Sequence, residues 1–132
     1  MAKNSIESLI ENMSPEYNSG DFVFVSVQSL SGIDIDDVLA LFRESEGISL
    51  VLTKVKAEEL NLNYDGVFSW ITLKVFSDLN DVGFTAAFSN ALAGEGISCN
   101  VIAGVNHDHI FVLKYDTNAA MKILSNLSEK GI

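Results

Sequence analysis

The clearest pattern of apolar and polar positions lies between residues 68 and 127. Apolar residues at i, i+3, i+4, i+7 and i+8 predict an amphipathic helix, and they are Phe84, Ala87, Phe88, Ala91 and Leu92. Alternating runs predict strands at residues 68–75, 97–103 and 107–115, the last two joined as a hairpin. A second helical stripe follows at Ala120, Ile123, Leu124 and Leu127. This order of elements is the ferredoxin-like one, which predicts an α+β sandwich with an antiparallel sheet and helices on one face.

The first half of the chain carries a weaker version of this pattern. A helical stripe comes first, at Ile6, Leu9, Ile10 and Met13. A polar turn is expected at residues 18–21, and strands are expected at residues 22–28 and 48–55. Between the strands, the spacing of Val38, Leu41 and Phe42 predicts a helix that Asp34 or Asp36 can cap.

A four-residue repeat suggests that the two halves are copies of one unit. Glu-Gly-Ile-Ser stands at residues 46–49 and again at residues 95–98, each time after a predicted helix. With the polar connector at residues 61–66 as boundary, the halves are residues 1–64 and 65–132. The first half is degenerate, because no hairpin partner or full helix follows residue 55. We expect the N-terminal helix to pack in place of that missing helix, beside the one predicted at residues 36–43.

Composition excludes several classes of protein. The net charge of −10 disfavours nucleic acid and anionic membranes as partners, since both need a positive surface. The single cysteine, Cys99, excludes an internal disulfide framework, and its strand position favours a small buried apolar residue over a reactive thiol. Neither a signal peptide nor an apolar run of ~18 residues is evident, so a cytoplasmic location is expected.

One face of the strand at residues 68–75 has implications for assembly. Phe68 and Trp70 share this face, and Phe76 continues its alternation. A solvated sheet face does not normally carry three aromatic residues together. Either more of the chain or another subunit must therefore cover it, and we expect a homo-oligomer, a dimer or larger.

The residues His107, Asp108 and His109 are the obvious candidates for metal or acid–base chemistry. On a strand the two imidazoles share a face, but a zinc site needs a third and a fourth ligand and the chain has only two histidines. No nucleophile with a spaced base is evident. We therefore expect no metal, no cofactor and no enzymatic activity. The alternative is that these side chains form hydrogen bonds around the turn before the strand.

The loop at residues 77–83 leads directly into the Phe84 helix and suits a zwitterion. Free N–H groups at a helix start, with Gly83 allowing close approach, favour a carboxylate. The nearby Asp78 and Asp81 can pair with an ammonium group. The alternative is an ordinary strand–helix turn with Asp81 as the helix cap.

The segments at residues 83–87, 96–104 and 107–109 resemble the ACT domain, and more closely the small stand-alone tandem-ACT proteins of the CASTOR-like type. The resemblance implies a regulatory module that binds a small molecule, usually an amino acid, between paired domains. The implied ligand positions on the loop are Asp81, Val82, Gly83, Phe84 and Thr85. Those on the strand of a neighbouring domain are Asn100 and Val101. The alternative function is an oligomerisation or adaptor module with a vestigial pocket; the ligand and the regulated partner stay open.

Overall fold

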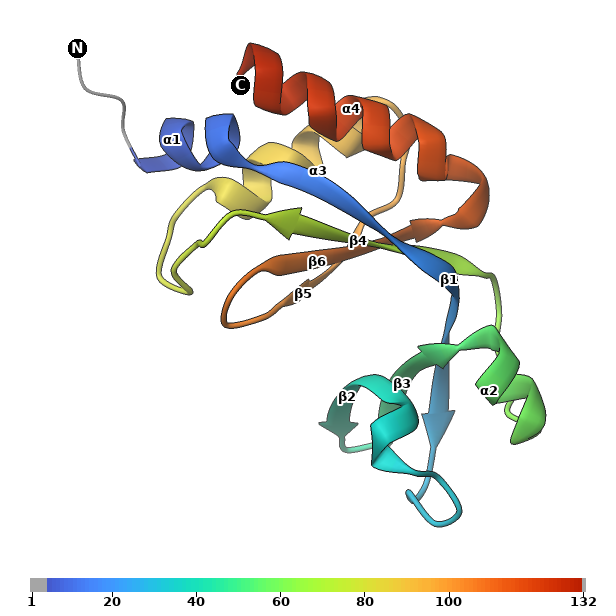
Figure 1. The fold of residues 1–132 in the computed structure, drawn as a ribbon. Coiled ribbons are helices and arrows are strands. Elements are labelled where there is room, and N and C mark those ends of the chain that lie inside the picture. Colours follow the sequence, from blue (N-terminus) through green and yellow to red (C-terminus); the bar gives the residue numbers. More distant parts are fainter. Residues whose placement is uncertain (1–4, 132) are drawn as a thin grey trace. The chain divides into compact units, whose positions relative to one another are not determined.

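The computed structural model describes residues 5–131, which contain both helices and strands (Figure 1). The helices are α1 (Ser5–Asn12), α2 (Lys54–Glu59), α3 (Phe84–Gly94) and α4 (Thr117–Lys130), with short 3-10 turns at Ile35–Asp37 and Lys114–Asp116. The strands are β1 (Ser14–Val27), β2 (Val38–Glu44), β3 (Gly47–Thr53), β4 (Phe68–Lys74), β5 (Asn100–Ala103) and β6 (Asp108–Leu113). None of the described helices combines the length and the apolar character needed to cross a membrane.

The chain packs as two compact units that share strand β1. The larger unit comprises the chain up to Ser19 and from Ser69 onward, and the smaller unit comprises Gly20–Phe68. The first residues of β1 therefore belong to the larger unit and its later residues to the smaller one. These units are defined by packing, whereas the halves at residues 1–64 and 65–132 are a division of the sequence, which stays a prediction.

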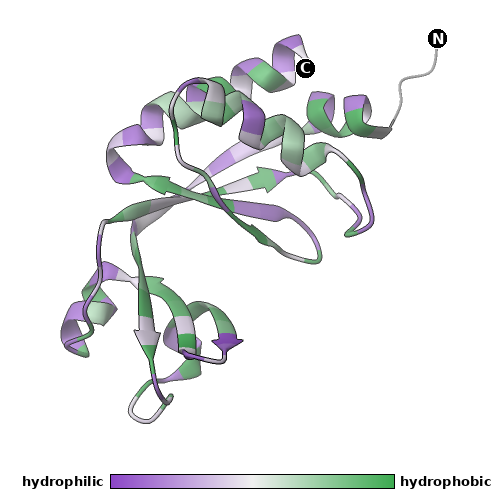
Figure 2. Cartoon of the chain, turned by 180° about the vertical axis from the view of Figure 1, so that it is seen from behind, coloured by the Kyte–Doolittle hydropathy of each residue, from purple (hydrophilic) through white to green (hydrophobic). Residues whose placement is uncertain are grey.

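The larger unit is a two-layer sandwich with its helices on one face, as the sequence predicted. Its strands follow the order β1-β4-β6-β5, and β5 and β6 form the predicted antiparallel hairpin. Helices α1, α3 and α4 cover one side of this sheet (Figure 1). The core between the layers is made of Ile10, Met13, Ile71, Leu73, Phe84, Phe88, Leu92, Ile97, Ile110, Val112, Ala120 and Leu124. Figure 2 shows that α4 mixes hydrophilic and hydrophobic residues, as a helix with one buried face must.

In the smaller unit, β3 lies between β2 and the later part of β1, and both pairings are antiparallel. The buried core is formed by Val23, Val25, Ile48, Leu50, Leu52 and Ala57. The helix predicted at residues 36–43 is wrong, because residues 38–44 form β2. The five apolar residues at 38–42 fit either period, and a turn at residues 45–46 lets them pair with β3 as a hairpin. Tertiary pairing thus overrides the helical spacing.

Two other expectations for the first half are also wrong. The turn predicted at residues 18–21 lies inside β1, where Gly20 accommodates a φ of +119°. The two Glu-Gly-Ile-Ser copies follow different elements, since the first begins in the β2–β3 turn and the second at the end of α3. Helix α1 packs on α3 and α4 of the larger unit, so it does not replace a helix of the first half.

Candidate functional site

The loop that joins β4 to α3, residues 75–83, is shaped by hydrogen bonds of its own. The Asp78 N–H donates to Asp81 Oδ2 at 2.6 Å, and the Asn80 N–H donates to Asp78 Oδ1 at 3.0 Å. The Asp81 N–H donates to the Asp78 carbonyl at 2.9 Å. The Asp81 carboxylate is thus directed into the loop, and it is not the cap of α3.

The N-terminus of α3 has no side-chain cap. Gly83 occupies the N-cap position with φ 100° and ψ −15°, a left-handed conformation that side chains rarely adopt. A Cβ added to Gly83 would lie 3.6 Å from Ile6 Cδ1 of α1, which is ordinary van der Waals contact. The first N–H groups of α3 are consequently available to an anion, and the helix dipole favours one there.

The side chains of the predicted loop residues point in two directions, some to the surface and one into the core. Asp81, Val82, Gly83 and Thr85 are exposed, whereas the Phe84 ring lies in the core of the larger unit. Phe84 can therefore offer only its backbone N–H to a ligand. Val82 is 89% exposed, so its side chain makes little contact with the described residues.

The two predicted strand residues lie on β5, the outermost strand of the larger unit. Asn100 is exposed and donates from Nδ2 to the Phe111 carbonyl at 3.3 Å, while Val101 pairs with Ile110. Ala103 is the end of β5 nearer the loop, so Asn100 lies about 10 Å further along the sheet. The larger unit by itself does not bring Asn100 to its own loop.

Asp108 was considered from the sequence for metal or acid–base chemistry but was not selected as a ligand contact. It alternates with His107 and His109 and so faces the helices, where it is only 9% exposed. Among residues 5–131, no hydrogen bond or ion pair joins another group to its carboxylate, and burial raises its pKa. Because β6 starts where β4 ends, Asp108 and the α3 N-terminus share one end and one face of the sheet. Alternation with Ile110 and Val112 was the signal in the sequence.

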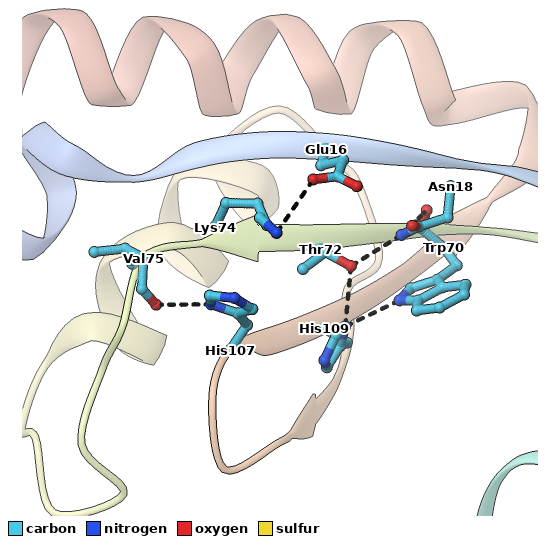
Figure 3. Close-up of polar contacts among 8 residues, drawn as sticks. All are labelled: Glu16, Asn18, Trp70, Thr72, Lys74, Val75, His107 and His109. Carbon is cyan, nitrogen blue, oxygen red and sulfur yellow. Dashed lines mark hydrogen bonds and ion pairs between the residues drawn. The ribbon is translucent and has the colours of Figure 1, made fainter.

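His109 ties three strands together on the face opposite the helices (Figure 3). Its Nδ1 accepts from Trp70 Nε1 at 3.0 Å and is 3.1 Å from Thr72 Oγ1, which itself accepts from Asn18 Nδ2 at 2.9 Å. An indole N–H can only donate, so Nδ1 is unprotonated and the neutral ring carries its proton on Nε2. Burial, and then the nearby His107, lower the His109 pKa and favour this neutral form.

His107 carries the opposite tautomer. Its Nδ1 lies 3.1 Å from the Val75 carbonyl, which can only accept, so Nδ1 bears the proton (Figure 3). Its ring packs on Phe76 with centroids 4.9 Å apart. Metal binding through His109 Nε2 would require a proton on Nδ1 and would displace Trp70. Across the described part of the chain, no group of three or more histidine, cysteine or acidic side chains is arranged to hold a metal.

Burial disfavours the reactive form of the Cys99 thiol. Cys99 packs against the core of the larger unit, and burial raises the pKa of its thiol to about 11. The thiolate that would react with an electrophile is therefore almost unpopulated at neutral pH. This agrees with its interpretation as a small apolar residue.

Comparison with known proteins identifies the fold. A model of the ACT domain family matches residues 2–69, and a second ACT domain model matches residues 67–126. A crystal structure from Vibrio cholerae, of a protein of unknown function described as a possible transport protein, is 46% identical; the match covers 94% of this chain and 96% of that one, with a TM-score of 0.85.

Two more distant structures share the fold alone. A protein from Agrobacterium tumefaciens is 16% identical with a TM-score of 0.72, over 88% of this chain and 89% of that one. The ligand-free regulatory subunit of aspartate kinase from Thermus thermophilus is 8% identical with a TM-score of 0.58, over 85% of this chain and 95% of that one. No curated protein matches the sequence.

Proposed function

Because this chain belongs to the ACT domain family and carries two such domains in tandem, we propose that it is a regulatory module that binds a free amino acid and has no catalytic activity. Its fold is also that of a regulatory subunit of aspartate kinase, which supports a regulatory role. The ligand site we propose is the β4–α3 loop with the first turn of α3, including Asp81, Val82, Gly83, Phe84 and Thr85.

The observation that carries this proposal is the uncapped, glycine-led start of α3. An α-carboxylate can accept from the free N–H groups of the first turn, where no side chain competes for them. Gly83 leaves open space beside these donors, since only Ile6 lies near the position of an added Cβ. A carboxylate at this position also gains from the helix dipole, by about 0.3–1 kcal/mol at an exposed site.

Asp108 supplies the opposite charge that a zwitterion needs. Its carboxylate has lost part of its hydration and is held by no hydrogen bond or ion pair among the described residues, so an ammonium group would recover part of that cost. The carboxylate of Asp78 keeps one oxygen that the loop hydrogen bonds do not use, and it is a second candidate for this contact.

We propose that a neighbouring domain closes the site. Asn100 and Val101 lie on the outermost strand and away from their own loop, so we propose that β5 of a second copy covers the ligand. Binding would then stabilise the assembled form over the separate copies, which is the differential affinity that a regulatory effect requires.

A thermal-shift screen of the twenty proteinogenic amino acids tests the proposal. A ligand at 100 times its dissociation constant contributes about 2.7 kcal/mol, which for a chain of this size raises Tm by roughly 5–15 °C. Gly83→Leu is expected to abolish the shift. Gly96→Leu is the matched control, because Gly96 has a positive φ of 75°, lies just past the other end of α3 and has nothing within 4 Å of an added Cβ.

The two variants separate strain from ligand exclusion. Both should lower the ligand-free Tm, since a side chain at positive φ is strained, but only Gly83→Leu should lose the ligand shift. An equal shift in both variants would place the ligand elsewhere. If no amino acid at ten millimolar moves the wild-type Tm, the amino-acid function is refuted.

An oligomerisation or adaptor module is the second candidate. The exposed apolar side chains of the loop and its surroundings favour it, since Phe76 is 78% and Leu79 is 66% exposed. Light scattering that shows a stable dimer, together with melts that no amino acid changes, would support this function over the first.

A further inference from the structure

The β5–β6 hairpin reaches the β4–α3 loop through one side chain, His107. This residue precedes β6 and makes two contacts with the first residues after β4. Its Nδ1–H donates to the Val75 carbonyl at 3.1 Å, and its ring packs on Phe76 (Figure 3). The contact joins segments 32 positions apart in the sequence.

The Val75 carbonyl needs a hydrogen-bond donor because β4 ends just before this residue. The Val75 N–H turns back to the Leu73 carbonyl at 3.0 Å, which is the hydrogen bond of a three-residue turn. This turn takes the Val75 peptide out of the strand ladder. The His107 imidazole then supplies a donor to its carbonyl, which lies in a half-buried position where loss of a hydrogen bond costs free energy.

His107 is itself held by the hairpin turn. The Gly104 N–H donates to the His107 carbonyl at 2.9 Å, and a Cβ added to Gly104 would lie only 2.8 Å from that oxygen. Only glycine allows this approach of the two backbones. The imidazole therefore projects toward the loop from a backbone that is fixed on both sides, by the turn and by the β5–β6 ladder.

We propose that His107 is a positioning residue for the ligand loop: by fastening Val75 and Phe76 it fixes where the loop leaves the sheet and so where the first N–H groups of α3 point. This inference rests on the proposed function of the loop. His107 acts through the loop and needs no contact with the ligand. Its Nδ1–H is present in both the neutral and the charged ring, so the fastening does not depend on the protonation of His107 itself.

Hydrogen exchange of the ligand-free protein tests the positioning. The amides of Asp78, Asn80 and Asp81 are hydrogen-bonded within the loop and should exchange slowly. In His107→Phe, which keeps a ring for Phe76 but removes the donor, we expect exchange at residues 76–83 to be about three- to tenfold faster, as the loss of one hydrogen bond predicts. His107→Asn retains an N–H donor and should restore slow exchange.

His109→Phe is the matched control on the same face of β6. It removes the bonds to Trp70 and Thr72 but leaves the Val75 contact intact, so exchange of the loop should stay as in the wild type. Unchanged loop exchange in His107→Phe, or an equal increase in His109→Phe, would overturn the proposal. A purely structural role would also show as faster exchange throughout β5 and β6, and that result would equally overturn it.

A binding measurement connects the loop to function. The probe is a mixture of the twenty proteinogenic amino acids, and the expected result is a smaller Tm shift in His107→Phe than in the wild type, restored in His107→Asn. If the mixture leaves the wild-type Tm unchanged, the proposed function fails; the exchange data alone then decide whether His107 positions the loop. If the mixture raises the Tm of the wild type and raises the Tm of both His107 variants by the same amount, His107 does not position the site.

Discussion

Mild acid is expected to destabilise this protein through one residue, His109. Its Nδ1 lone pair receives the Trp70 indole N–H, and Thr72 lies at hydrogen-bonding distance from the same atom. A proton on His109 Nδ1 would make this nitrogen a donor, and it would then face the Trp70 indole N–H, which can only donate. Protonation must therefore break the Trp70 bond and weaken the link between β4 and β6.

The sign of the effect follows from the direction of the pKa shift. Burial, with a smaller contribution from His107, lowers the folded-state pKa of His109 below its usual 6.5. Between the folded and unfolded values, the unfolded chain binds more protons, so the free energy of unfolding falls as the pH falls. The contribution is complete above pH 6.5 and is lost as the pH falls to the folded pKa. Asp108 has the opposite sign, because burial raises its pKa and acid then stabilises the fold.

The expected magnitude comes from the Trp70 hydrogen bond alone, because the Thr72 hydroxyl can accept from a protonated Nδ1. One such bond contributes about 0.5–1.5 kcal/mol net, with the lower part of this range favoured because His109 is only half-buried. For a chain of this length, 1 kcal/mol corresponds to a Tm change of roughly 3–4 °C. We therefore expect Tm to fall by roughly 2–5 °C once His109 is protonated.

Thermal melts between pH 7.5 and pH 5.0 measure this effect, and fluorescence locates it. Trp70 is the only tryptophan, so its emission should change with the same midpoint as the stability. His109→Gln removes the titrating group and should abolish the fall, while His107→Gln should retain it. A wild-type Tm that is constant over this range, or an equal fall in His109→Gln, would refute the reasoning.

Three further predictions follow from other contacts. Asp108→Asn should raise the ligand-free Tm at pH 7, because it removes a desolvated charge, and it should also reduce any rise in Tm caused by an amino acid. A lower ligand-free Tm in this variant would show that the carboxylate makes favourable interactions in the wild type. Gly104→Ala should lower Tm by several degrees, since its Cβ would lie 2.8 Å from a backbone oxygen, and Gly94→Ala, with nothing within 4 Å, is the control for comparison of melts. Light scattering at micromolar concentration should show at least a dimer, and a monomer alone would contradict closure of the site by a second copy.

The larger unit could be predicted from the sequence because its apolar positions have one clear period in each element. Ile71 and Leu73 face the helices while Trp70 and Thr72 face away, as the alternation indicated. The smaller unit could not, since the apolar run at residues 38–42 fits a helix as well as a strand. Asn18 was assigned to a turn for a related reason: its polar side chain is satisfied by β4, which local sequence cannot show.

For the candidate site, the sequence located the loop but not its internal bonds. Asp81 was a plausible helix cap, yet its carboxylate bonds to the Asp78 N–H, which leaves Gly83 at the N-cap. Alternation placed Asp108 opposite the two histidines, but its lack of a partner depends on which groups surround it in three dimensions. In the proposed site, the strand with Asn100 comes from a neighbouring domain. The local pattern of one chain carries no information on how two domains associate.

Because both units share β1, the choice of an expressed fragment and the order of synthesis both affect how this chain folds. Expression of residues 65–132 alone would remove α1 and β1, and with them Ile10 and Met13 of the larger core, and would expose β4 as a sheet edge prone to aggregation. During synthesis, β1 emerges long before β4, its neighbour in that sheet, so the larger unit closes only after the smaller one has been made. The tandem repeat is therefore two modules in sequence whose residues are divided differently between the two packed units.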